Sequence, residues 1–310
     1  MKSKYLWIFL GLIGISWIFN YTYYQYNQLD KPIFLKHYYV NEIYDENQLT
    51  FYYLTNKDDR SLINYVRIDG VDFYPQNQFG MWSNNIPPYV QEFRHHYLRS
   101  VTIPFSKQII PIKDGSNMAW SFEDMEIGFS NQPPSMVNIG KVQFSPITNQ
   151  ERFLESRMSS SNNQHRSDES LVALESVIIE GFDIPFPELN DDIEVKINLN
   201  QKKLKELEDL RNGKEIPKWL NENMQADWNS VKGISIKEIP FPFTLEKNEW
   251  LNIMTFTNPE ANNVIGLGLR MKGKTIDGKT FTSKTYISEQ PYLEQKDVDE
   301  IIAESKGGKE

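Results

Sequence analysis

VIGLGLRMKGKTIDGKTFTSKTYIS, residues 264–288, is the stretch that decides between two folds. It matches the phosphate-loop pattern G-x-x-x-x-G-K-[ST] twice, once with Lys274 and once with Lys279 as the lysine. A phosphate loop needs a helix directly after its glycines, because the amides at the helix N-terminus bind the phosphate. The residues that follow here are rich in Thr and aromatic side chains and show no amphipathic helical stripe. Asp277-Gly278 is instead a strong signal for a two-residue hairpin turn.

We therefore predict a β-hairpin with strands at 264–275 and 279–287 and with solvent-facing lysines. Gly266 and Gly268 lie two residues apart on one strand face, where they leave room for a neighbouring ring or main chain. On this interpretation the stretch binds no nucleotide, and it indicates a protein built from antiparallel strands.

Three segments repeat a strand–loop–strand pattern. They are LTFYYLTNKDDRSLINYV (49–66), MEIGFSNQPPSMVNIGKV (125–142) and LNIMTFTNPEANNVIGLGL (251–269). In each, a β-rich run ends in Thr-Asn or Ser-Asn, a polar loop follows, and a second β-rich run begins. Asn suits these turns because it tolerates left-handed backbone and bonds its own main chain.

The tetrapeptide Ile-Pro-Phe-Pro occurs at 184–187 and again at 239–242. Proline lacks the N–H that a strand ladder needs, so both copies are expected at an edge strand or at a corner between strands. An edge strand with proline, followed by inner strands and an Asn turn, is typical of antiparallel sandwiches. The repeat favours an internal duplication over chance similarity among β sequences.

These patterns predict a mainly β protein with two antiparallel β-sandwich-like domains of Ig-like architecture, at 30–156 and 171–290. Between them, RMSSSNNQHRSDES (157–170) has no apolar periodicity and is rich in Ser and Asn, so we predict a linker or long surface loop. The segment 291–310 is charged and is predicted to be a tail or a frayed helix.

A short helical insertion is predicted at 201–231, inside the second domain. Leu204, Leu207 and Leu210 form one apolar stripe, and Asn200 can cap the first helix. Two short helices of this kind are expected to cover a sheet face or an open end.

The segment 5–24, YLWIFLGLIGISWIFNYTYY, is predicted to be a transmembrane helix, because about 20 apolar residues cross a bilayer. Lys2 and Lys4 lie in the short segment 1–4 and favour a cytoplasmic N-terminus with the body outside. The alternative is a signal peptide cleaved near Gly14-Ile15-Ser16, although the apolar run continues past that point.

The 310-residue chain has no cysteine, which excludes a thiol nucleophile, a cysteine zinc site and an iron–sulfur cluster. A eukaryotic ectodomain of this size usually carries disulfides, so the absence favours a bacterial envelope protein, a Gram-positive one included. Asp and Glu total 42 against 33 Lys and Arg, a net charge of −9 that argues against nucleic acid as a partner.

No pattern indicates catalysis, a cofactor or a metal. The four histidines are His37, His95, His96 and His165. His95 and His96 are adjacent and would point to opposite faces of a strand, so they cannot easily share a ligand. The acidic runs are Asp58-Asp59, 114–117 and 190–192. Turn chemistry explains these runs better than calcium binding, which needs six to eight oxygens from a recognisable loop.

One aromatic loop is the candidate partner-binding site. Residues 79–89, FGMWSNNIPPY, carry Phe79, Met81, Trp82 and Tyr89 in a segment rich in Pro, Asn and Gly. Such loops are either packed Ω-loops or binding tips. As a binding tip, this one would contact an envelope protein or a glycan.

The sequence thus predicts a single-pass membrane protein that acts without catalysis, in binding, assembly or sensing at the envelope. The alternative is an envelope enzyme that uses paired carboxylates on a cell-surface polymer. Two carboxylates facing each other across a cleft, about 5–10 Å apart, would favour the enzyme.

Overall fold

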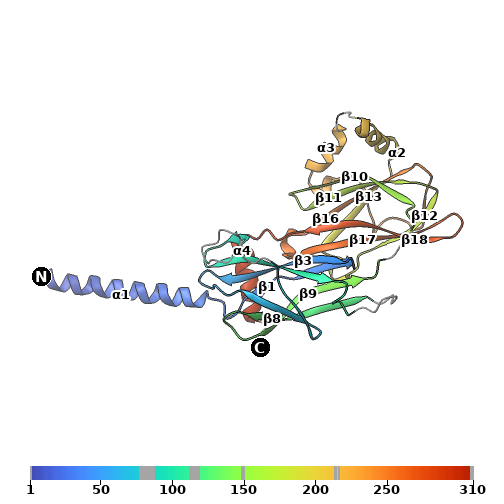
Figure 1. Ribbon diagram of the computed structural model, residues 1–310. Helices are drawn as coiled ribbons and strands as arrows, with labels where there is room; N and C mark the ends of the chain where they lie inside the picture. Colours follow the sequence, from blue (N-terminus) through green and yellow to red (C-terminus); the bar gives the residue numbers. More distant parts are fainter. Residues whose placement is uncertain are drawn as a thin grey trace.

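The computed structural model describes residues 2–76, 88–111, 119–147, 151–212, 215 and 217–307. The protein is mainly β, with three sheets of four, nine and five strands and few helices in these ranges. Figure 1 shows helix α1 (Lys2–Tyr26) projecting from one end of a β-rich body. Helices α2 (Gln201–Leu204) and α3 (Lys218–Gln225) lie at the opposite end.

Helix α1 is long and apolar enough from Tyr5 to Tyr26 to cross a membrane, and the described part of the chain buries none of that span. Its apolar side chains point in all directions, which is the pattern of a lipid-exposed segment rather than of a surface helix of a soluble protein. The predicted apolar helix is therefore present, in a form that suits a membrane anchor or a signal peptide.

The three sheets are named here A, B and C. Sheet A has the order β1 (Ile33–Phe34), β3 (Glu46–Asn56), β7 (His96–Ser106), β6 (Gln91–Glu92). Sheet B has the order β15 (Phe243–Leu245), β12 (Val177–Asp183), β17 (Val264–Thr275), β2 (His37–Glu42), β9 (Ser135–Ser145), β8 (Trp120–Phe129), β4 (Ile63–Ile68), β5 (Val71–Phe73), and β18 (Thr280–Glu289) also pairs with β17. Sheet C has the order β10 (Leu154–Asn162), β11 (Arg166–Ala173), β16 (Trp250–Thr257), β13 (Ile193–Asn198), β14 (Ile234–Ser235).

Sheet B runs through both halves of the chain. Strand β2 pairs in parallel with β17 on one side and with β9 on the other. Side chains alternate along a strand; accordingly His37 and Tyr39 contact the aromatic residues of one core, while Tyr38 and Val40 pack on another. The main-chain pairing is thus continuous between the predicted domains, whose division stays a prediction.

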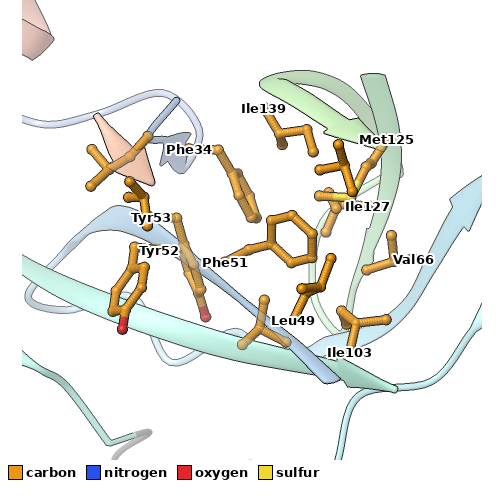
Figure 2. Close-up of a cluster of buried hydrophobic side chains, with 14 of the residues drawn as sticks. Phe34, Leu49, Phe51, Tyr52, Tyr53, Val66, Ile103, Met125, Ile127 and Ile139 are labelled. Atoms are coloured by element: carbon orange, nitrogen blue, oxygen red, sulfur yellow. The ribbon is translucent and has the colours of Figure 1, made fainter. Parts of the chain in front are cut away.

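The first core gathers side chains from sheet A and from the N-terminal strands of sheet B. Figure 2 shows Phe51 of β3 at its centre, with Ile103 of β7 on one side and Met125 and Ile127 of β8 on the other. Phe51, Ile103 and both β8 residues are fully buried. This end of the body is therefore held together by large apolar residues from both sheets.

The second core gathers side chains from sheet C and from the C-terminal strands of sheet B. Leu267 and Leu269 of β17 and Ile179 of β12 meet Leu251 and Ile253 of β16 there. All five side chains have almost no exposed surface. Burying each such side chain contributes about 1.5–3 kcal/mol.

The predicted strand–loop–strand units are confirmed. Segment 49–66 lies in β3 and β4, segment 125–142 lies in β8 and β9, and segment 251–269 lies in β16 and the first half of β17. Of the three, the second unit is a paired hairpin, whereas β3 and β4 lie in different sheets, as do β16 and β17. The two Ile-Pro-Phe-Pro segments lie between strands of sheets B and C, at the corners predicted for proline.

Residues 264–288 form a hairpin, as predicted. Strands β17 and β18 pair from Ile265↔Glu289 to Lys274↔Thr280, and Gly278 in the turn has a φ of +87°. The turn is longer than the two residues predicted, because the Thr275 amide donates to the Lys279 oxygen across residues 276–278 and Asp277 is not left-handed. A β-carbon at Gly266 would lie 2.8 Å from the Tyr39 ring. The glycine therefore makes room for an aromatic side chain, and a strand follows the turn where a phosphate loop would have a helix.

The predicted linker 157–170 is wrong. These residues lie in β10 and β11, which pair with each other, and β11 also pairs with β16. The segment lacks apolar alternation because β10 is an edge strand, and because one face of β11 carries the buried polar residues Arg166, Asp168 and Ser170. Main-chain pairing rather than apolar patterning holds these strands in place.

Of the two alternatives predicted for 291–310, a tail or a frayed helix, the structure has a helix, and this helix is packed on the body. Helix α4 (Gln295–Gly307) packs on the first core through Val298 and Ile302, and Leu293 precedes it there. Val298 and Ile302 lie four residues apart, which places them on one helix face. Charged residues on the other faces conceal this short apolar stripe in the sequence.

The helical insertion appears as predicted, with α2 and α3 separated by a 3-10 segment at Lys205–Asn212. The side chain of Asn200 accepts a hydrogen bond from the Lys203 amide and so caps α2. Leu204 and Leu207 are buried against Trp250 of sheet C, whereas the side chain of Leu210 lies outside the described residues. The insertion therefore covers one face of sheet C.

Candidate functional site

The last turn of α1 is bonded to the β-rich body. The Tyr24 hydroxyl donates to Oδ2 of Asp58 at 3.3 Å, and Nη1 of Arg94 donates to the Tyr23 hydroxyl at 3.3 Å. Nζ of Lys306, in α4, donates to the main-chain oxygen of Tyr26 at 2.7 Å. Three separate parts of the body therefore contact the last turn of one apolar helix. We call this region the helix junction.

Two histidines complete the helix junction. The His95 ring meets the Tyr23 and Tyr24 rings edge to face, with centroids 5.7 and 6.2 Å away. Nε2 of His96 lies 2.9 Å from the main-chain oxygen of Asn27, and burial lowers the pKa of His96 below its usual value. Both rings pack against the end of α1, and no shared ligand is needed to explain their positions.

The chain then crosses to sheet A through a two-way amide pair. The Leu29 amide donates to Oδ1 of Asn56 at 2.8 Å, and Nδ2 of Asn56 donates back to the Leu29 oxygen at 2.8 Å. Asn56 is the Asn of the first Thr-Asn turn, but its side chain bonds the main chain of Leu29 instead of its own, and in this way it fixes the entry of the chain into the body.

A pocket of about 220 Å³ opens beside the helix junction. It is lined by Leu29, Asp30, Lys31, Pro32, Asn56, Asp58, Asp59 and Gln132. Asp58 is the residue that accepts the Tyr24 hydroxyl, and Oδ1 of Asp59 accepts the Ser61 amide at 2.8 Å. The pocket, called here the junction pocket, therefore combines a lysine with carboxylates at the end of the apolar helix.

A buried arginine lies behind this pocket. Arg99 is 1% exposed, and its Nη2 donates to the main-chain oxygen of Asp59 at 2.5 Å. Among the described residues, its Nε and Nη1 have no partner, nor do the buried hydroxyls of Thr55 and Ser61. Burial lowers the pKa of Arg99 from its usual value, although Tyr53 and Asp59 favour the charge. The guanidinium also lies over the Tyr97 ring, 5.9 Å from its centre.

Of the four candidate side chains in the predicted partner-binding loop, Tyr89 lies within the described ranges. Phe79, Met81 and Trp82 lie outside them, and their role stays a prediction. Tyr89 is 47% exposed, and its ring stacks on Tyr97 with centroids 4.4 Å apart.

Tyr89 lies on the same side of the body as the helix junction. Nζ of Lys57 lies 5.5 Å from the centre of the Tyr97 ring and 2.5 Å from Oε1 of Glu92. Lys57 directly precedes Asp58, which lines the junction pocket. One residue of the predicted loop is thus brought close to the pocket.

Other candidates from the sequence, His37 and Asp192, are hydrogen-bonded to neighbouring protein groups. His37 is fully buried, and its Nε2 accepts the Tyr52 amide at 2.8 Å. Asp192 accepts a hydrogen bond from the side-chain amide of Asn263, whereas the acidic run 114–117 lies outside the described residues. Within the described ranges, no group of three His, Asp or Glu side chains could hold a metal ion.

Sequence reasoning did not find the junction pocket. It explained Asp58-Asp59 by turn chemistry, but nothing in the sequence indicates that this turn meets the end of the apolar helix. Arg99 lies in a strand pattern where a surface charge would be expected. Its burial follows only from the loop 57–61 that folds over it.

The comparisons with known proteins assign no relative. No protein-family model matches the chain, and no curated protein matches its sequence. The candidate site therefore rests on geometry and chemistry alone.

Proposed function

We propose that the protein is a single-pass, membrane-anchored, extracytoplasmic module that binds, assembles or senses without catalysis at a bacterial envelope. The observation that carries the proposal is the helix junction, where Tyr23, Tyr24 and Tyr26 are bonded to the body. Lys2 and Lys4 favour a cytoplasmic N-terminus, which places the body outside. The lack of cysteine fits a bacterial host, a Gram-positive one included.

Helix length supports a body held at the membrane surface. About 20 residues at 1.5 Å each span the hydrocarbon core, and counting from Tyr5 brings Tyr24 to its outer boundary. Tyr residues at this level favour the headgroup region. Because Asp58, Arg94 and Lys306 are bonded to this turn, the body is held close to the end of the helix.

We also propose that each half of the body is a β-sandwich-like unit and that the two share sheet B. The first core collects residues of sheets A and B, and the second collects residues of sheets B and C. Two facing sheets around each core are what sandwich packing requires. A binding role suits such a body, because its loops lie at the ends of the sheets and apolar side chains fill both cores.

The alternative, an envelope enzyme with paired carboxylates, would find its carboxylates in the junction pocket. Asp30, Asp58 and Asp59 all line it. However, Asp58 accepts the Tyr24 hydroxyl and Asp59 accepts the Ser61 amide, so each has a structural task. These bonds favour binding over general acid–base work.

The proposal is tested by locating the full-length protein in bacterial cells. Protease added to intact protoplasts should remove the body beyond residue 30, and a cytoplasmic marker protein should survive as the control. Alkaline carbonate should leave the chain in the membrane fraction, whereas a peripheral protein is released. Full protection of the body would contradict the outward orientation, and release by carbonate would contradict the anchor.

A further inference from the structure

We propose that the junction pocket binds the phosphoethanolamine headgroup of a membrane lipid. The inference rests on the proposed function, because it needs the body to lie at the bilayer surface. It is carried by the pocket's position, its size and the charges that line it.

The position is set by the bond between Tyr24 and Asp58. Tyr24 lies at the outer end of the apolar span, about 20 residues after Tyr5, and its hydroxyl is 3.3 Å from the Asp58 carboxylate in the pocket wall. Leu29, which also lines the pocket, follows the end of α1 by three residues. The pocket therefore lies at the depth of lipid headgroups.

The size suits a small group. Pockets for drug-sized ligands measure about 300–1,000 Å³, whereas the junction pocket measures about 220 Å³. A headgroup that enters from the bilayer while its acyl chains stay in the membrane needs no larger space. Its tether to the membrane also raises its local concentration.

The lining is complementary to a zwitterion. Asp30, Asp58 and Asp59 offer carboxylate oxygens to a primary ammonium, which has three N–H donors. Lys31 offers a cation to the phosphate. A choline headgroup has no N–H to donate, and a glycerol headgroup has no cation. Phosphatidylethanolamine therefore fits this lining better than either.

The test uses the full-length protein in vesicles with equal parts of phosphatidylcholine, phosphatidylethanolamine and phosphatidylglycerol. After mild detergent extraction, native mass spectrometry measures which lipid stays bound. We expect phosphatidylethanolamine to be retained over phosphatidylcholine by about threefold or more, a modest difference in affinity. Retention of the two lipids in equal amounts overturns the proposal, as does a preference for phosphatidylglycerol.

Two variants and two matched controls locate the binding. Asp58→Asn and Lys31→Gln should each remove the preference, and Asn at position 58 can still accept the Tyr24 hydroxyl. Asp191→Asn and Lys247→Gln change exposed residues in the other half of the body and should keep it. Near-ultraviolet circular dichroism checks that each variant is folded. An unchanged preference in folded Asp58→Asn and Lys31→Gln overturns the assignment to this pocket.

A final arm separates a lipid from a free metabolite with the same headgroup. Glycerophosphoethanolamine is added to the detergent-solubilised protein before lipid is measured. Displacement only at large excess supports a membrane source, whereas tight binding of the free compound overturns it. Carbonate extraction decides the anchor separately, because the lipid preference is measured in vitro whether or not the chain stays in cell membranes.

Discussion

Gly140 of β9 lies directly against the main chain of His37 in β2. A β-carbon at position 140 would be 2.5 Å from the His37 carbonyl oxygen and 2.7 Å from its nitrogen, and Gly140 has a φ of +92°. This contact holds β9 beside the strand that carries both cores on its faces. Only glycine fits at position 140 without moving one of these two strands apart.

Gly140→Ala should therefore destabilise the protein by about 2–4 kcal/mol, from the left-handed backbone and the clash together. Gly181→Ala is the matched control, since a β-carbon there would have no described atom within 4 Å and the φ of Gly181 is not left-handed. Urea unfolding of the full-length protein in detergent micelles, followed by tryptophan fluorescence, measures both. If Gly140→Ala and Gly181→Ala unfold with equal free energies, the main chains at positions 37 and 140 can move apart without loss of stability, which would contradict the prediction.

The hairpin at 264–288 predicts a contrast between its turn glycine and its lysines. Gly278→Val should cost about 1–2 kcal/mol, because a β-branched residue at a φ of +87° is strained. Lys274→Ala and Lys279→Ala should each cost under about 1 kcal/mol, since their ion pairs with Glu180 and Glu151 are exposed. Thermal unfolding with and without Mg-ATP is the measurement. Stabilisation by ATP that vanishes in Lys274→Ala would contradict the prediction that this stretch binds no nucleotide.

Asp168 should make the protein less stable as pH rises. Burial raises the pKa of its carboxyl from 3.8 to about 6, although Arg166 acts in the opposite direction. The folded state therefore binds the proton more tightly than the unfolded chain, and stability should fall between about pH 4 and pH 6. Asp168→Asn removes the charge and should gain about 1–3 kcal/mol at pH 7 but little at pH 4.

Chemical unfolding across pH 4–7 measures this effect, with the exposed Glu175→Gln as the control. A gain that is the same at pH 4 and pH 7 would assign it to packing instead of ionisation.

His37 should act in the opposite direction. Burial lowers the pKa of its ring from 6.5 to about 3, and the ring is held neutral with Nε2 accepting the Tyr52 amide and Nδ1 facing the Ile139 oxygen at 3.3 Å. The folded state then binds fewer protons than the unfolded chain, so the stability from this neutral ring is present above pH 6.5 and lost as pH falls towards 3.

His37→Gln keeps an acceptor and a donor but cannot be protonated in this range. The stability difference between wild type and His37→Gln should shrink as pH falls from about 7 to about 4. Chemical unfolding at several pH values measures it. A difference that stays constant would show that His37 does not titrate on unfolding.

Local chemistry was read correctly from the sequence. The apolar run 5–24, the position of the hairpin turn at Gly278, the proline corners and the Asn200 cap each depend on a few neighbouring residues, whose backbone preferences act wherever the segment lies. The helical insertion was predicted for the same reason. Each of these features is present in the structure over nearly the expected residues.

Tertiary structure decided what neighbouring residues could not. Only pairing with β10 and β16 makes a strand of the segment Arg166–Ala173, and only the first core gives Val298 and Ile302 a surface to bury. The junction pocket is of the same kind: Asp58 was visible as a turn residue, but its contact with Tyr24 joins positions 34 residues apart. Such contacts follow from which strands share a sheet, and main-chain hydrogen bonds pair strands of any sequence. The sequence therefore determined the elements and their turns, and the packing of three sheets determined where they meet.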